Sequence, residues 1–429
     1  MKSRNLVAVV ALAVALTDLG AASPVGAAPS AEGPTVLRAA PEQALGARGA
    51  AERGRFRPRP GVTFNSPGDF SINDKVLRAI RHSFKRSKIR AMTWNFNSWV
   101  FVRALREAHK RGASVRIIIS RRLAREQGPG GPFRTLQRNL DRGNKRRPKR
   151  YRSWARTCYH SCRGKGGAMH TKMYVFSKVG AQRRVVMSSS ANMTGSAGTA
   201  QYNDMFTITG RRSAYRGSIK VFNQAAKDRP APVFSYKSGP INGWFQPRRG
   251  RRPDVVMHML DKVRCKGARG AGINGRTSIR IAQDVMLGDR GARIAAKLRS
   301  LHRHGCNIRL VYSQLGGRIW QLTRNIPRNH LVQDRDGDGA YDVYLHMKAM
   351  AISGHYGSKR GARVVYQGSE NWSGVANLSD EQGLIIRREN VERKYGRRIN
   401  RLFKIHLVSA VPLFRTTPQV DDPYMNMEG

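Results

Sequence analysis

The sequence is poor in acidic residues and in long apolar runs. Only 27 of its 429 residues are Asp or Glu, against 79 Lys and Arg, so the formal net charge is +52. Such a positive field attracts polyanions, which include nucleic acid, anionic lipid and cell-wall polymer. Charge alone does not say which anion binds, and a solvated arginine-rich surface without a partner explains the composition equally well. Beyond the N-terminus no stretch is long and apolar enough to span a membrane.

The N-terminus has the pattern of an export signal. Lys2 and Arg4 precede a short apolar run over 6–16, and small residues follow as far as Ala28. Residues 1–28 are therefore predicted to be a signal peptide, and the protein to be secreted. The apolar run is too short for a membrane anchor. Residues 29–60 are rich in Ala, Gly, Pro and Arg and are expected to form a flexible leader.

Two parts of the chain repeat one order of elements. Apolar spacing predicts helix, strand, helix and strand over 73–84, 88–94, 101–110 and 115–119. The same order recurs over 255–263, 278–282, 290–302 and 308–313, and residues 109–116 match 302–309 closely. This is an internal duplication of an α/β unit. We expect a first half over 61–227, a second half over 255–429, and a proline-rich linker over 228–254.

The four cysteines are even in number, which in an exported chain favours disulfides. Three pairings are possible, and we prefer Cys158–Cys162 and Cys265–Cys306 because each pair then lies within one half. The rival interpretation is a metal site made of Cys158, His160 and Cys162, but this segment lacks a second ligand pair at the usual spacing.

Each half carries a His-x-Lys triplet in an expected strand, followed by a second strand that ends in Ser-x-Asn. A lone His-x-Lys means little, but its recurrence at matching points of a duplication indicates a shared chemical role. The alternating side chains of a strand place the members of each pair on one face. The residues are His170, Lys172, Ser190 and Asn192 in the first half and His346, Lys348, Ser369 and Asn371 in the second.

These residue types suit the cleavage of a phosphodiester. The reaction needs a nucleophile, a proton donor for the leaving oxygen, and cations around the phosphoryl oxygens. Two histidines can divide the first two tasks, lysines can neutralise charge, and asparagines can donate hydrogen bonds to the same oxygens. Such a set requires no cofactor.

The paired motifs resemble the HKD motif of the phospholipase D superfamily, whose two motifs assemble one active site between pseudo-symmetric halves. The resemblance extends over nearly the whole chain from Gly61. It implies an α/β fold of two pseudo-symmetric lobes, with mixed β-sheets flanked by helices. It also implies that one of His170 and His346 forms a covalent phosphohistidine, with preference for His170, while the other acts as general acid and then base. Lys172, Lys348, Asn192 and Asn371 would then bind phosphate.

The sequence departs from that motif at one position in each half. The Asp expected five residues after the Lys is Ser177 in the first half and Ser353 in the second, which leaves the catalytic strength open. In related enzymes an acidic residue after the second strand can orient a histidine. Asp204 and Glu381 occupy comparable places and could fix the imidazole tautomer; the alternative is a solvated loop carboxylate.

An acidic segment over 334–342 matches the start of a calcium loop. Oxygen ligands alternate and Gly is sixth, but the twelfth position is Leu345 rather than Glu, and no flanking helices are evident. Calcium is therefore possible, and a flexible acidic turn is the alternative. The candidate ligands are Asp334, Asp336, Asp338 and Asp342.

Together these features predict a secreted, monomeric phosphodiesterase of the phospholipase D type. It would hydrolyse phospholipids, or transfer their phosphatidyl group, during transient contact with a membrane surface. Approach to lipid requires apolar residues near the site, and Trp94, Phe96, Trp99, Trp320 and Trp372 are candidates, although buried packing is their commoner fate. The alternatives are a nuclease of the same superfamily, which the charge favours, and a non-catalytic binder of polyanions, which only Ser177 and Ser353 favour.

Overall fold

The computed structural model describes residues 54–145, 147–247, 254–407 and 413. The predicted signal peptide and most of the predicted leader lie outside these residues. At the end of the leader, Phe56 already packs on the ordered chain, with its ring centroid 4.1 Å from that of His82.

The first half forms a seven-stranded mixed sheet. Its three consecutive strands β2, β4 and β5 are parallel, and the remaining neighbours are antiparallel. In spatial order the strands are β1 (Gly61–Phe64), β10 (Asp204–Thr209), β7 (Gln182–Ser189), β6 (Met173–Val179), β2 (Lys88–Met92), β4 (Ser114–Ser120) and β5 (Trp154–Cys158).

Helices cover this sheet because each has an apolar stripe at helical spacing. In the first of them Val76, Leu77 and Ile80 are buried against the sheet side while the charged residues face out. The helices of this half are α2 (Ser71–Arg81), α3 (Trp99–Lys110), α4 (Arg121–Glu126), α5 (Pro132–Arg142), α6 (Ser196–Thr199) and α7 (Arg212–Ala225).

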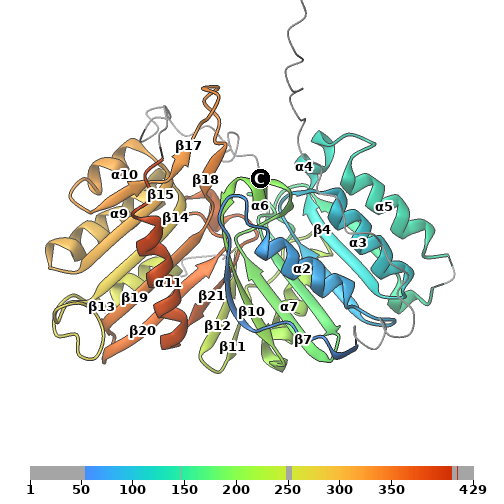
Figure 1. Ribbon diagram of the computed structural model, residues 1–429, viewed down its shortest axis with the longest axis horizontal. Coiled ribbons are helices and arrows are strands. Elements are labelled where there is room, and N and C mark those ends of the chain that lie inside the picture. The colour runs from blue at the N-terminus through green and yellow to red at the C-terminus, as the bar shows by residue number, and fades with distance from the viewer. Residues whose placement is uncertain (1–53, 146, 248–253, 408–412, 414–429) are drawn as a thin grey trace, which may run out of the picture. The chain divides into compact units, whose positions relative to one another are not determined.

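The second half repeats the plan in a nine-stranded mixed sheet (Figure 1). In spatial order its strands are β11 (Ser235–Ser238), β12 (Ile241–Phe245), β21 (Gln382–Ile386), β20 (Lys359–Gly368), β19 (Lys348–Tyr356), β14 (Ser278–Met286), β15 (Asn307–Leu315) and β16 (Arg328–His330), with β13 (Val263–Arg264) paired to β19. Its helices are α8 (Val255–Asp261), α9 (Gly288–Arg303), α10 (Gly317–Leu322) and α11 (Glu389–Leu402).

The segment 228–254 is more than the linker that its prolines suggest. Its strands β11 and β12 form a hairpin, and β12 pairs with β21, so the hairpin is the edge of the second sheet. The proline content fits this place, because strands at a sheet edge tolerate prolines near their ends. Within each half one disulfide closes a loop, and the pairs are those expected, Cys158–Cys162 and Cys265–Cys306.

The two halves are joined where the His-x-Lys triplets lie. A short strand β9 (Gln201–Tyr202) of the first half pairs in parallel with β18 (Val343–Leu345) of the second, and an isolated parallel bridge links Met169 to Asp380. One continuous hydrophobic core contains residues of both halves, for example Met169 and Met347. The junction therefore holds both triplets in a buried and closely packed interior.

Candidate active site

Both histidines stand just before a strand rather than within it. Strand β6 begins at Met173 and β19 at Lys348, so His170 and His346 precede the sheets that the sequence pattern assigned them to. The reason is that their backbone pairs with the opposite half. The N–H of His170 donates to the carbonyl of Asp380, and the N–H of His346 donates to the carbonyl of Tyr202, each at 3.0 Å.

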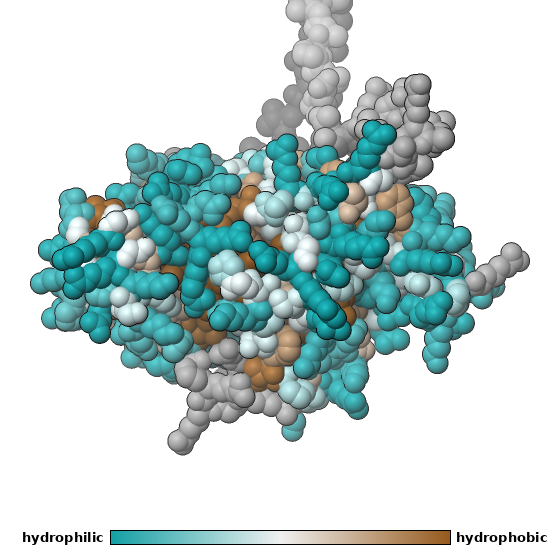
Figure 2. Space-filling model, turned by 90° about the horizontal axis from the view of Figure 1, so that it is seen from below, coloured by the Kyte–Doolittle hydropathy of each residue, from teal (hydrophilic) through white to brown (hydrophobic). Residues whose placement is uncertain are grey.

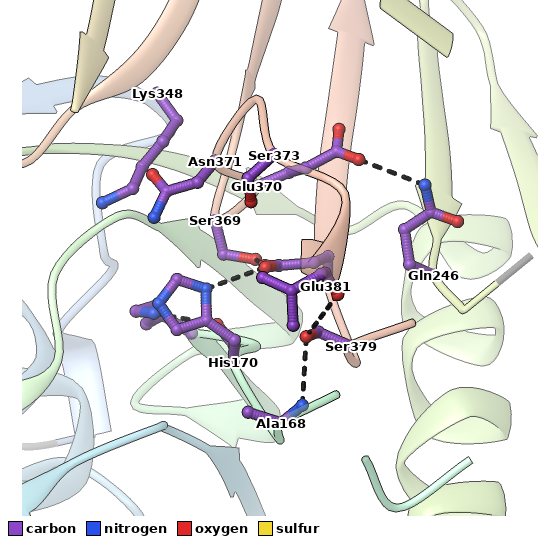
Figure 3. Close-up of polar contacts among 12 residues, drawn as sticks. Ala168, His170, Gln246, Lys348, Ser369, Glu370, Asn371, Ser373, Ser379 and Glu381 are labelled. Atoms are coloured by element: carbon purple, nitrogen blue, oxygen red, sulfur yellow. Dashed lines mark hydrogen bonds and ion pairs between the residues drawn. The ribbon is translucent and has the colours of Figure 1, made fainter. Parts of the chain in front are cut away.

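His170 is held by a carboxylate of the second half. Its Nδ1 lies 2.8 Å from Oε1 of Glu381, and both side chains are almost completely buried. The hydroxyl of Ser369 donates to the other oxygen of Glu381, so the carboxylate is fixed in turn (Figure 3). The hydrogen bond at Nδ1 fixes the tautomer and the orientation of the ring.

His346 is held by an amide of the first half. Its Nδ1 lies 2.9 Å from Oδ1 of Asn203, and the hydroxyl of Ser190 donates to the same oxygen at 2.8 Å. An amide oxygen accepts a hydrogen bond but carries no net charge. The imidazole of His346 is therefore oriented as that of His170 is, without a neighbouring negative charge at Nδ1.

Asp204, which the sequence pattern singled out to orient a histidine, does not contact His346. Its Oδ2 accepts a hydrogen bond of 2.6 Å from the hydroxyl of Tyr395. The alignment of the halves was wrong by one residue, and adjacent residues of a strand point to opposite faces. The N–H of Ser190 donates to the carbonyl of Asp204, as that of Ser369 donates to the carbonyl of Gln382.

Asp204 thus corresponds to Gln382, and Asn203 corresponds to Glu381. Sequence reasoning missed Asn203 because it sought a carboxylate in both halves. Asn203 would have been found by aligning the halves on Ser190 and Ser369 and by allowing the first half one extra residue between this serine and the residue that orients the histidine.

The two lysines are anchored alike but have different neighbours. Nζ of Lys172 donates to the carbonyl of His170 at 2.9 Å, and Nζ of Lys348 donates to that of His346 at 2.7 Å. Lys348 also forms an ion pair of 2.7 Å with Asp284. Lys172 instead lies over the indole ring of Trp94, 5.5 Å from its centroid.

Both asparagines present an unsatisfied donor. Oδ1 of Asn192 accepts from the N–H of Asn95 and from the hydroxyl of Thr93, each at 3.3 Å, so its amide is oriented. Within the described chain, Nδ2 of Asn192 and Nδ2 of Asn371 are buried without a hydrogen-bond partner. Buried donors of this kind are costly unless a ligand satisfies them. In Figure 3 Asn371 and Lys348 extend together above the His170 ring.

Burial and the positive charges of the two lysines determine the direction in which the pKa values of the histidines and of Glu381 shift. Burial, the two lysines and His346 lower the pKa of His170 well below its usual value, and burial with both lysines does the same to the pKa of His346. Burial raises the pKa of Glu381 well above its usual range, whereas Lys172, the hydroxyl of Ser369 and Lys348 lower it and so favour the carboxylate. These mutual effects place both histidines and both lysines in one electrostatic cluster.

Ser177 and Ser353 lie farther along their strands and make structural hydrogen bonds. Oγ of Ser177 accepts from the N–H of Lys88 at 2.8 Å. Oγ of Ser353 accepts from the N–H of Gly272 at 3.0 Å and from Arg363 at 2.9 Å. Neither serine contacts a histidine or lysine of the cluster in the described chain.

Two candidate metal sites have different outcomes. Cys158 and Cys162 form a disulfide, so the metal interpretation of that segment is wrong. Asp334, Asp336 and Asp338 have carboxylate oxygens within 4.8 Å of one another, whereas Asp342 accepts from the N–H of Arg335 at 2.6 Å. Calcium binding at this loop stays a prediction.

The family described as "Cardiolipin synthase, PLD-like domain" matches residues 76–225. No curated protein matches the sequence. Among solved structures, phosphatidylserine synthase from Haemophilus influenzae Rd KW20 is similar over 81% of this chain and 86% of its own, with 12% identity and a TM-score of 0.56.

Polyphosphate kinase from Porphyromonas gingivalis matches 80% of this chain with 14% identity and a TM-score of 0.53; this chain spans 47% of that kinase, about half its length. A phospholipase D family member from Salmonella typhimurium matches 40% of this chain and 96% of its own, with 20% identity and a TM-score of 0.31. The likenesses to the synthase and the kinase establish the two-lobed α/β fold.

Proposed function

We propose that this chain, in which residues 76–225 match a PLD-like family, is a member of the phospholipase D superfamily and a secreted phospholipid hydrolase that acts through a phosphohistidine at His170. The observation that carries the proposal is the crossed support of the two histidines. Glu381 of the second half holds His170, and Asn203 of the first half holds His346.

In the first step Nε2 of His170 attacks the phosphorus atom and the bond to the leaving oxygen breaks. His346, protonated at Nε2, gives its proton to that oxygen. The two lysines and the two unsatisfied asparagine amides stabilise the negative charge that develops on the phosphoryl oxygens. In the second step His346 takes a proton from water, which attacks phosphorus and breaks the N–P bond.

Glu381 favours His170 over His346 as the nucleophile. A carboxylate that accepts the Nδ1 proton increases the electron density at Nε2 and stabilises positive charge on the ring as the N–P bond forms. Asn203 gives His346 the same orientation with less basicity. A weaker base is the better proton donor, which suits His346 to the role of general acid.

Two observations favour phospholipid as the substrate. The matching family and one of the similar structures are named for cardiolipin synthase and phosphatidylserine synthase. In addition, three large apolar side chains are exposed on segments that adjoin site residues. Trp99 follows Trp94 by five positions, Leu378 precedes Glu381 by three, and Tyr159 lies within the disulfide loop; they are 49%, 56% and 61% exposed.

Of the other aromatic candidates for lipid contact, three are buried core residues. Phe96 and Trp372 are fully buried, and Trp94 packs on His170 with its ring centroid at 5.3 Å. Trp320 lies under the guanidinium of Arg328. The apolar approach to the site is therefore assigned to Trp99, Tyr159 and Leu378.

A polynucleotide is the second candidate substrate, because the net charge of +52 suits a polymer with many phosphates. The face in Figure 2 is mainly hydrophilic, with separate apolar patches. Charge of this kind also draws the protein to an anionic membrane, and it does not by itself distinguish the two substrates.

The test compares both substrates with one preparation. Purified protein would be incubated with phosphatidylcholine vesicles and with plasmid DNA, each with and without chelator, and then trapped with a phosphorus-labelled diester. We expect release of phosphatidic acid, an acid-labile label on His170, and little nicking of DNA. DNA cleavage without lipid turnover would reassign the substrate. Absence of both turnover and label would leave a non-catalytic binder of polyanions.

Secretion belongs to the same proposal. The two disulfides are compatible with an oxidising compartment. Among the described helices none has the length and apolar character needed to cross a bilayer. N-terminal sequencing of protein recovered from culture medium is expected to give a mature chain that begins after position 28, whereas intact N-termini confined to cell pellets would contradict export.

A further inference from the structure

The register of the two sheets places Asp284 where the first half has Trp94. Strand β2 pairs Met92 with Met173, and strand β14 pairs Ala282 with Ala349. Met173 and Ala349 each follow the lysine of their triplet, so Met92 and Ala282 are equivalent positions. Two residues beyond them stand Trp94 and Asp284, each directed at the lysine of its own half. One half has an apolar ring at this point and the other a buried carboxylate.

Asp284 is completely buried and faces both reactive groups of the second half. Its Oδ2 lies 2.7 Å from Nζ of Lys348 and 3.9 Å from Nε2 of His346. Its Oδ1 has no hydrogen-bond partner within the described chain. An unsatisfied carboxylate oxygen in a buried site is costly, so a ligand that donates a hydrogen bond to it is expected.

The 3.9 Å between Oδ2 of Asp284 and Nε2 of His346 is too long for a direct hydrogen bond, and it brings the carboxylate, whose Oδ1 is unsatisfied, within reach of a single water molecule bound at Nε2. Nε2 of His346 is the atom that takes a proton from water in the second step. We propose that Asp284 positions this water, by accepting its second hydrogen, and thereby favours hydrolysis over transfer to an alcohol.

The inference rests on the proposed two-step function. At the phosphohistidine, one O–H bond of the water breaks and its proton goes to Nε2 of His346. The oxygen forms a bond to phosphorus, the N–P bond breaks, and its electron pair returns to His170. The second O–H bond stays intact and donates to Asp284. The products are a phosphate monoester, neutral His170 and protonated His346.

An alcohol cannot make both contacts. Its single hydroxyl hydrogen goes to His346, and its alkyl group occupies the direction in which water donates to Asp284. The carboxylate oxygen then stays unsatisfied next to a carbon chain, which disfavours the alcohol by roughly tenfold. Asp284 is in this sense a positioning residue, because it acts through the water and not on phosphorus.

The test measures how the phosphohistidine divides between two acceptors. The intact protein would react with bis(p-nitrophenyl) phosphate in buffer that contains ethanol. Released p-nitrophenolate reports the first step. The ratio of p-nitrophenyl ethyl phosphate to p-nitrophenyl phosphate reports the second, and it does not depend on how much of the protein is active.

In Asp284→Asn the amide oxygen remains with Lys348, so the NH₂ group, a donor, faces the water where an acceptor is needed. Asp284→Ala removes the acceptor. We expect both variants to raise the ratio of ethyl ester to monoester about tenfold. The matched control is Asp204→Asn, a second buried carboxylate with an unsatisfied oxygen, whose partner is Tyr395; its ratio should equal that of the wild type.

If Asp284 only anchors Lys348, both Asp284 variants lose turnover with an unchanged ratio, and the inference is overturned. A rise of equal size in Asp204→Asn would also overturn it, because the effect would then be a general loosening of the site. A wild-type protein that neither releases p-nitrophenolate nor acquires label on histidine would remove the proposed function, and the inference with it.

Discussion

The two halves hold their lysines and asparagines in the same way but hold their histidines differently. Lys172 and Lys348 are anchored by the carbonyl two residues earlier, and, among the described residues, Asn192 and Asn371 both have a buried N–H without a hydrogen-bond partner. In contrast, the residue at Nδ1 is Glu381 for His170 and Asn203 for His346, although both sit at one equivalent position. Under the proposed function, the symmetric lysines and asparagines would bind phosphate, and the difference at Nδ1 would give the two imidazoles separate roles.

The largest expected effects on turnover come from replacing the two histidines, and the two replacements should differ from each other. His170→Ala removes the nucleophile and should lower turnover by about 10⁵-fold or more with every diester. His346→Ala removes the general acid and should cost about 10²–10⁴-fold with an alkyl leaving group. With a p-nitrophenyl leaving group, which needs no proton, the first step of His346→Ala should be nearly preserved.

The measurement is a burst of p-nitrophenolate together with the label on histidine. In His346→Ala the phosphohistidine should form and persist, since no base is left to activate water. If the label instead persisted in His170→Ala, His346 would be the nucleophile and His170 the general acid.

A second prediction exchanges the groups at Nδ1. Glu381→Gln should lower turnover by about 10–100-fold, the usual cost of a lost partner behind a reactive histidine. Asn203→Asp should cost less than tenfold, because it adds a carboxylate behind a histidine that is already oriented. In the double variant His346 carries the carboxylate, so labelling should begin to appear on His346.

Peptide mapping of the trapped label is the measurement, and thermal unfolding of each variant is the control for folding. Equal loss of activity in Glu381→Gln and Asn203→Asp would mean that the two residues only support the fold.

The pH dependence should differ between free and substrate-bound protein. Burial and the charges of Lys172 and Lys348 hold the pKa of His346 well below its usual value in the empty site. His346 must be protonated to act, so kcat/KM should fall as pH rises through that low pKa. A bound diester is an anion and stabilises the protonated ring. The fall of kcat with rising pH should therefore occur at a higher pH than the fall of kcat/KM.

Lys348→Met removes one of the charges that lower this pKa, so its kcat/KM limb should move toward higher pH. The profile must be measured separately for kcat and kcat/KM. Coincident alkaline limbs in the wild type would contradict the assignment of His346 as the acid.

The sequence predicted the duplication, the histidines, the lysines and the disulfide pairs because each is a local pattern or a repeated one. It failed where the outcome depends on contacts between residues far apart in the sequence, either between the halves or within the second half. Asn203 and Asp284 lie 143 and 64 residues from the side chains they contact, and no spacing rule joins them. The start of β6 was also misplaced, because Lys172 donates its N–H to Gln382 of the other half rather than to a neighbour in its own sheet.

The smallest expected effect on turnover compares the two disulfides. The Cys158–Cys162 loop adjoins the site, because the N–H of Cys162 donates to the carboxylate of Asp380, whose carbonyl accepts from His170. Replacing both cysteines by Ala should therefore lower turnover a few-fold and stability by about 2 kcal/mol, as expected for so short a loop.

Cys265–Cys306 closes a loop with a sequence separation of 41, and the sulfur of Cys265 lies 3.1 Å from the carbonyl oxygen of Leu301, in helix α9. Removal of this disulfide should cost about 4 kcal/mol of stability and leave turnover per folded molecule unchanged. Denaturant unfolding and active-site titration separate the two quantities. Removal of Cys265–Cys306 could instead lower turnover while removal of Cys158–Cys162 leaves it unchanged. That result would mean that the contact of Cys162 with Asp380 does not affect the position of His170.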